Sequence, residues 1–72
     1  MPEDRAGHEL ELGRQVILEA EPPIIGVVDA VYPEQADILV LSEDNKLLRY
    51  RRVPNERLVV FGPNPRILPN RA

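Results

Sequence analysis

Hydrophobic and polar residues alternate along much of the chain, and this alternation predicts strands rather than helices. Between residues 10 and 20 most even positions are apolar, whereas the positions between them are mainly Glu, Gln or Gly. A period of two places one face of an extended segment in a core and the other in solvent. Pro22 and Pro23 end this segment, because proline cannot donate to a sheet ladder.

Four further extended segments follow the two prolines. The first, residues 24–32, is rich in β-branched residues and apolar on both faces, and Gly26 gives it a point at which to bend. Three shorter strands are expected at residues 37–42, 47–53 and 58–61. No segment carries a sustained apolar stripe of period 3.6, so no helix longer than one turn is expected.

A tight hairpin is expected between the third and fourth strands. A two-residue turn at Asp44-Asn45 sets Glu43 opposite Lys46, an opposite-charge pair, and fixes every other pair in the hairpin. Opposed residues share a face of the sheet. The predicted core face holds four large side chains and closes with an ion pair: Leu39, Leu41, Leu48 and Tyr50, with Asp37 and Arg52 at the end.

The opposite face of this hairpin is the predicted partner-binding surface. There the stems of Arg49 and Arg51 would cover two aliphatic residues while their guanidinium groups reach water. Arginine beside aliphatic side chains suits a protein interface, although ordinary surface packing gives the same pattern. The predicted partner-binding residues are Ile38, Val40, Arg49, Arg51 and Arg57.

Three short motifs fit a small barrel. Val53-Pro54-Asn55 resembles the Val-Pro-Ser-Asn of eukaryotic SH3 domains. Residues 12–16 and 26–31 resemble the Gly-x-x-Val and Gly-x-Val-x-x-Val spacings of KOW-type barrels. Over about residues 12–61 the chain thus resembles the SH3-like barrel superfamily, which implies an all-β, five-stranded small barrel with a short 3₁₀ turn before the last strand.

This resemblance carries a fold and not a function. The chain has no tryptophan, and the aromatic groove that grips Pro-x-x-Pro ligands in SH3 domains is missing. The barrel is expected to span residues 9–61. Residues 1–8 are expected to form a disordered acidic lead, and residues 62–72 a mobile proline-rich tail.

Charge is distributed unevenly about the net value of −3. Residues 1–45 hold two arginines against eleven acids, giving −9, and residues 46–72 hold seven Lys or Arg against one acid, giving +6. Such asymmetry accompanies nucleic-acid or acidic-partner surfaces. Opposite charges that meet across neighbouring strands would also explain it, and this is the favoured interpretation.

Several function classes find no support in the sequence. The chain has no cysteine, its one histidine is His8, and no phosphate-binding or calcium-binding loop is recognisable. No apolar run approaches the roughly 20 residues of a membrane span, and the acidic start is unlike a signal peptide. We therefore expect a cytoplasmic, non-catalytic protein without cofactor, metal, membrane contact or small-molecule substrate.

Two binding functions remain. The first is a protein-interaction or small subunit module that docks a partner or a second copy through one face of the barrel. The alternative is binding of RNA or single-stranded DNA, which combines a cationic track with aromatic stacking platforms. That track would draw on Arg49, Arg51, Arg57 and Arg66, with Tyr32 and Phe61 as the remaining aromatics. The eleven acids in the first half repel phosphate, so a protein partner or self-association ranks ahead of nucleic acid.

Overall fold

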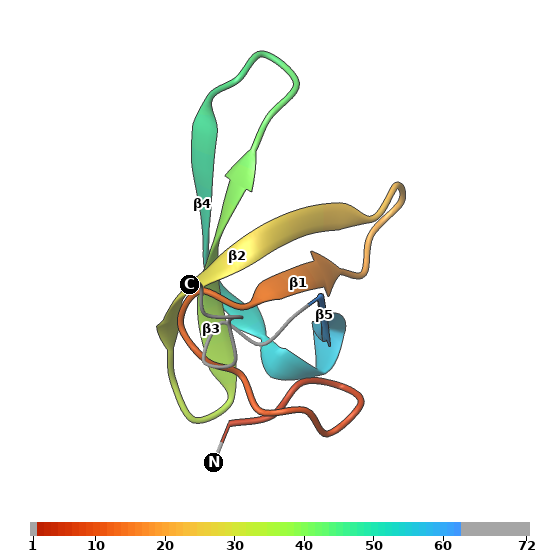
Figure 1. Ribbon diagram of the computed structural model, residues 1–72, viewed down its shortest axis with the longest axis vertical. Coiled ribbons are helices and arrows are strands. Elements are labelled where there is room, and N and C mark those ends of the chain that lie inside the picture. The colour runs from red at the N-terminus through yellow and green to blue at the C-terminus, as the bar shows by residue number, and fades with distance from the viewer. Residues whose placement is uncertain (1, 63–72) are drawn as a thin grey trace, which may run out of the picture.

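A computed structural model describes residues 2–62 and shows an all-β chain (Figure 1). Five strands form one antiparallel sheet, and a single 3₁₀ turn precedes the last of them. The strands are β1 (Gln15–Leu18), β2 (Ile24–Val31), β3 (Gln35–Leu41), β4 (Leu47–Pro54) and β5 (Leu58–Phe61), with η1 at Asn55–Arg57. The predicted all-β class, the five strands and the 3₁₀ turn are confirmed.

The sheet is open, so the predicted closed barrel is wrong. The strand order is β4-β3-β2-β1-β5, and within residues 2–62 β4 pairs only with β3 and β5 only with β1. In Figure 1 the tip of the β3–β4 hairpin projects away from the body. The opposite edge strand, β5, has only four residues and lies beside β1.

One face of the sheet carries the core. Its most deeply buried large side chains are Val16 from β1, Ile38 from β3 and Leu58 from β5. Val28, Val40 and Val60 complete the central packing from β2, β3 and β5. Tyr50 is half-buried against this cluster, as the sequence predicted.

Gly26 allows β2 and β3 to approach closely. A Cβ atom at this position would lie 2.8 Å from the Leu39 carbonyl oxygen and 3.1 Å from Cγ2 of Val40. The first contact is with rigid main chain, so no larger residue fits without moving β3. The irregularity in β2 lies further on, where Asp29 is an extra residue between the Val28 and Ala30 pairs.

The hairpin register differs by one residue from the predicted one. Leu41 pairs with Leu47, and the next pairs are Val40–Leu48, Leu39–Arg49 and Ile38–Tyr50. The cause is a longer loop than the predicted two-residue turn. Ser42 N–H donates to the Lys46 carbonyl oxygen at 2.8 Å, and Lys46 N–H donates to Ser42 Oγ at 3.1 Å.

A shift of one residue exchanges the two faces of a strand. Ile38 and Val40, predicted to lie on the outside, are therefore buried in the core. Leu39 and Leu41, predicted to lie in the core, face outward, and Leu41 is 61% exposed. The outward placement of Ile38 and Val40 is thus corrected.

Asp37 and Arg52 do meet, but through the main chain rather than as an ion pair. In β4 two residues, Arg51 and Arg52, stand against the single Asp37 of β3. At this bulge Arg52 has a φ of 56°, and its N–H donates to Asp37 Oδ1 at 2.8 Å. The Arg52 guanidinium instead stacks on Tyr32, 3.8 Å from the ring centroid.

Residues 2–8, predicted to form a disordered lead, lie against the sheet in the structure, where Asp4 anchors them. Its buried carboxylate accepts hydrogen bonds from the N–H groups of Ala6, His8 and Val60, at 2.9, 2.7 and 2.7 Å. Arg5 N–H donates to the Leu58 carbonyl oxygen at 2.9 Å. The prediction for the tail concerns residues that, beyond Gly62, lie outside the described part of the chain.

The observed register predicts a large loss of stability for one aliphatic substitution in β3 and almost none for another. Ile38→Ala removes a fully buried side chain and should lower the free energy of unfolding by about 3 kcal/mol. Leu41→Ala removes an exposed one and should change it by less than about 0.5 kcal/mol. Urea denaturation measures both. The register predicted from the sequence would require the reverse, with Leu41→Ala lowering the free energy of unfolding more than Ile38→Ala.

Asp4 should make stability depend on pH. Burial, the largest influence, raises the pKa of Asp4, but hydrogen bonds from the N–H groups of Val60, His8 and Ala6 and from the His8 side chain together lower it below the ordinary 3.8. A lowered pKa in the folded state stabilises above the unfolded pKa, and this contribution is lost as pH falls through the folded value.

Asp4→Asn should therefore destabilise at neutral pH by about 2 kcal/mol, the scale of hydrogen bonds to a charged group. The difference from wild type should shrink as pH falls below about 4. Denaturation at a series of pH values measures this. A difference that stays constant down to acid pH would show that the carboxylate charge does not hold the segment.

Candidate protein-interaction surface

The face of the sheet opposite the core is largely apolar. Cross-strand pairing aligns one row of residues from β5 to β4, namely Phe61, Gln15, Val27, Leu39 and Arg49. A second row beside it holds Val59, Ile17 and Ile25, which pair across β5, β1 and β2, and the Leu41–Leu47 pair, which lines the same hollow as Ile25. We call these ten residues the outer face. Eight of them are hydrophobic, on a surface where an antiparallel sheet usually alternates to polar residues.

Solvent reaches much of the outer face. Ile25 is 59% exposed, Leu47 is 70% exposed, and Val27 beside them is exposed as well. With Gln15, Gly26, Leu39 and Leu41, these three side chains line a shallow hollow of about 410 Å³ between β2 and the hairpin. Contiguous exposed apolar surface of this kind marks interaction sites in soluble proteins.

Charge on the outer face is largely neutralised within the chain. Arg49 is the one charged residue among the ten, and its Nη2 lies 2.9 Å from Oδ2 of Asp29. Both side chains are partly exposed, so this ion pair adds little to stability. Because of this ion pair, the outer face presents aliphatic groups and no unpaired charge among its ten residues.

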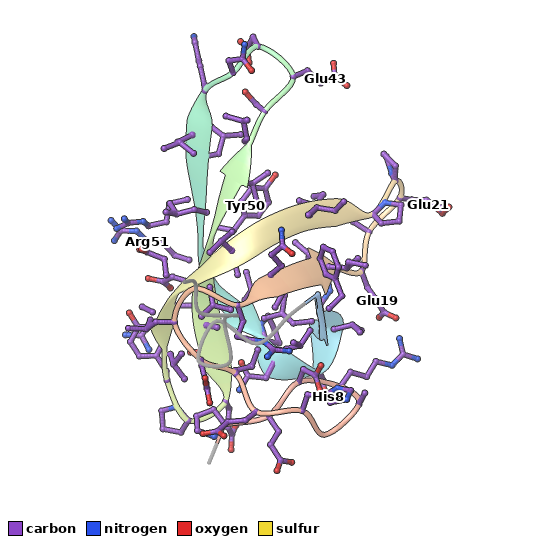
Figure 2. All side chains as sticks on the ribbon, in the orientation of Figure 1. His8, Glu19, Glu21, Glu43, Tyr50 and Arg51 are labelled. Carbon is purple, nitrogen blue, oxygen red and sulfur yellow. The ribbon has the colours of Figure 1, made fainter. Side chains whose placement is uncertain are left out.

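The five predicted partner-binding residues do not form one surface. Ile38 and Val40 are buried, so neither can reach a partner. Arg49 and Arg51 stay together on β4, and the Arg51 side chain has no hydrogen bond or ion pair within residues 2–62. Arg57 lies on η1, where its Nη2 donates to the Glu19 carbonyl oxygen at 2.6 Å. Figure 2 shows Arg51 and Glu19 on opposite sides of the molecule.

Sequence reasoning missed Ile25, Val27, Leu41 and Leu47 as candidate surface residues. A signal for them was present, because β2 and β3 are apolar at both odd and even positions. A strand that is apolar at both odd and even positions is usually buried on both faces. The sheet buries only one of them.

The described residues hold neither a metal-ligand cluster nor a membrane-spanning helix. No group of three or more His, Asp or Glu side chains in this part of the chain could hold a metal ion. No helix there is long and apolar enough to cross a membrane. Arg66, part of the predicted basic track, lies outside residues 2–62.

Comparison with protein-family models, curated proteins and solved structures finds no match to this chain. Function is therefore inferred from the surface chemistry of the chain itself.

The outer face should bind a dye that reports exposed apolar surface, while its side chains contribute little to stability. Ile25→Ser with Leu41→Ser removes two exposed side chains and should change the free energy of unfolding by less than about 1 kcal/mol in total. The same pair should reduce the fluorescence of 1-anilinonaphthalene-8-sulfonate bound to the folded protein. Leu12→Ser is the matched control, because Leu12 is 63% exposed but lies before β1. Equal fluorescence from all variants would show that the face is not a contiguous apolar surface.

Proposed function

We propose that this chain is a non-catalytic protein-interaction module that docks a partner protein through the outer face. The observation that carries the proposal is the row of exposed aliphatic side chains on β2, β3 and β4, above all Ile25, Leu41 and Leu47. Full burial of one such side chain contributes roughly 1.5–3 kcal/mol. Three of them around one hollow can thus supply the apolar centre of an interface.

The surroundings of the hollow suit a protein partner. Polar and charged groups border it, including Gln15 at one side and the Arg49–Asp29 pair at another. An apolar centre with a polar rim is the common arrangement of protein interfaces. The small size of the face favours a modest contact rather than an obligate one.

The nucleic-acid alternative has less support. Arg49 is paired with Asp29, and the Arg57 guanidinium donates to the Glu19 carbonyl oxygen on the other side of the molecule from Arg51. The ring of Tyr32 is covered by the Arg52 guanidinium, and Tyr50 packs against the core. Stacking platforms and a continuous cationic track are both needed for single strands. The described residues offer no continuous track, and Phe61 on the outer face is the one aromatic left as a platform.

We also propose that the open sheet is related to SH3-like barrels. Support comes from η1, a single 3₁₀ turn of three residues between β4 and β5 that starts directly after Pro54. The motif at this point, Val53-Pro54-Asn55, is the one that resembles SH3 domains. This relation concerns the fold and adds nothing to the choice of partner.

Affinity capture from a native lysate tests the interaction. Tagged wild-type protein, the Ile25→Ser/Leu41→Ser variant and the Leu12→Ser control are compared at equal loading. A partner that binds through the outer face should be retained by wild type and Leu12→Ser. The double variant should recover it roughly tenfold less, as expected when interface anchors are lost. Partners captured equally by all three proteins would contradict the proposal.

A further inference from the structure

The two edge strands of the sheet, β5 and β4, differ in whether their outward main-chain groups are hydrogen-bonded. The edge at β5 is occupied, because Val60 N–H donates to the Asp4 carboxylate and the Leu58 carbonyl oxygen accepts from Arg5 N–H. No described element pairs with the outer edge of β4, the strand at the margin of the ribbon in Figure 1. The molecule therefore closes one edge with its own N-terminal segment and leaves the other open.

Hydrogen-bond alternation identifies the groups that β4 presents. The Ser42–Lys46 pair is hydrogen-bonded through its main chain at 2.8 Å. Bonded and non-bonded pairs alternate along an antiparallel ladder, so Leu48 and Tyr50 direct their N–H and C=O groups toward β3. The corresponding groups of Leu47 and Arg49 then point outward. An unpaired row of this kind is a template for another strand.

We propose that the β4 edge binds an extended segment of the partner protein as a sixth strand, and that this segment alternates acidic and apolar residues. The inference rests on the proposed function, since it specifies the partner. Main-chain pairing at a sheet edge is an established way for domains to bind peptides. It also selects a protein, because nucleic acid has no matching ladder of amide donors and acceptors.

Side chains on β4 define the two rows that the segment would meet. Arg49 and Arg51 follow Leu47 on the side of the outer face, whereas Leu48 and Tyr50 lie on the core side. Acidic residues of the segment would stand beside the arginines, and apolar residues beside Leu48 and Tyr50. Leu48 is exposed in the isolated chain, as expected for a residue that a neighbouring strand would cover.

The charges around this edge favour an acidic segment. Lys46, Arg49, Arg51 and Arg52 all belong to β4 or precede it directly. Asp29 neutralises Arg49, and Glu43 and Asp44 lie in the hairpin loop. The Arg51 side chain has no partner within residues 2–62, so an acidic neighbour would meet an uncompensated charge.

The same arginines disfavour the registers in which β4 pairs with the β4 of a second copy about any residue from 49 to 52. A two-fold axis perpendicular to the sheet places one residue opposite itself and its neighbours opposite each other. Centred on Arg49, Arg51 or Arg52, it sets an arginine against its own copy. Centred on Tyr50, it sets Arg49 against Arg51. Like charges directly opposite one another destabilise a strand pair.

A peptide titration tests the inference. The probe is a short labelled peptide in which Glu and Val alternate, and its counterpart carries Lys in place of Glu. Binding is followed by anisotropy and by amide chemical shifts of the protein. The Glu peptide should bind, shift the amides of Leu47 and Arg49 and protect them from hydrogen exchange. The Lys peptide should bind roughly tenfold more weakly or not at all.

Two substitutions at one position separate the main chain from the side chain. Leu47→Pro removes an outward N–H that has no hydrogen-bond partner among residues 2–62, and proline is tolerated on an edge strand. It should weaken the Glu peptide by roughly tenfold, as expected for one unmade interface hydrogen bond. Leu47→Ala keeps the N–H and should retain more of the affinity. Arg51→Glu should reverse the preference between the two peptides.

Every outcome decides the inference. No binding of the Glu peptide, or equal binding by Leu47→Pro and Leu47→Ala, would overturn it. Self-association of the protein alone that Leu47→Pro abolishes would also overturn it, in favour of a second copy. Amide dispersion in the nuclear magnetic resonance spectrum verifies that each variant is folded. If the peptide fails while capture depends on Ile25 and Leu41, the edge inference fails and the proposed function stands. If instead the Glu peptide binds and capture does not depend on Ile25 and Leu41, the outer face is rejected as the docking surface and the edge inference stands.

Discussion

The hydrogen bonds of the loop between β3 and β4 are the constraint on which the rest of the sheet depends. Ser42 closes this loop with both its N–H and its hydroxyl oxygen, each bonded to the main chain of Lys46. The closure fixes which residue of β4 faces which residue of β3. Because side chains alternate across a strand, it also decides that Ile38 enters the core while Leu41 meets solvent.

The class of fold could be predicted from the sequence, whereas the register of the β3–β4 hairpin could not. The strands follow from alternation and β-branched composition, and Pro54 marks the end of β4, so the class of fold could be predicted. The register could not, because β3 is apolar at every position from Ile38 to Leu41. Either face of such a strand satisfies the hydrophobic pattern. Only the geometry of the Ser42 loop distinguishes them, and the loop sequence also fits a two-residue turn.

Two buried aspartates illustrate a second limit of sequence reasoning. Asp37 accepts a hydrogen bond from Arg52 N–H at the bulge, and Asp4 accepts one from Val60 N–H across most of the chain. Both carboxylates take the place of a carbonyl oxygen where the regular ladder is interrupted. In the sequence each is only one acid among twelve. No local pattern distinguishes Asp4 from its neighbour Glu3, so the ordered N-terminal segment could not be foreseen.

The N-terminal segment along β5 has a consequence for assembly. A sheet with two free edges can add chains at both ends and so grow without limit into a fibre. Here Asp4 and Arg5 occupy the groups through which growth at one edge would proceed. A strand that joins at β4 thus has no counterpart at the far edge, where a second chain would first have to displace the N-terminal segment. The fold itself therefore directs the addition of strands to one side of the sheet.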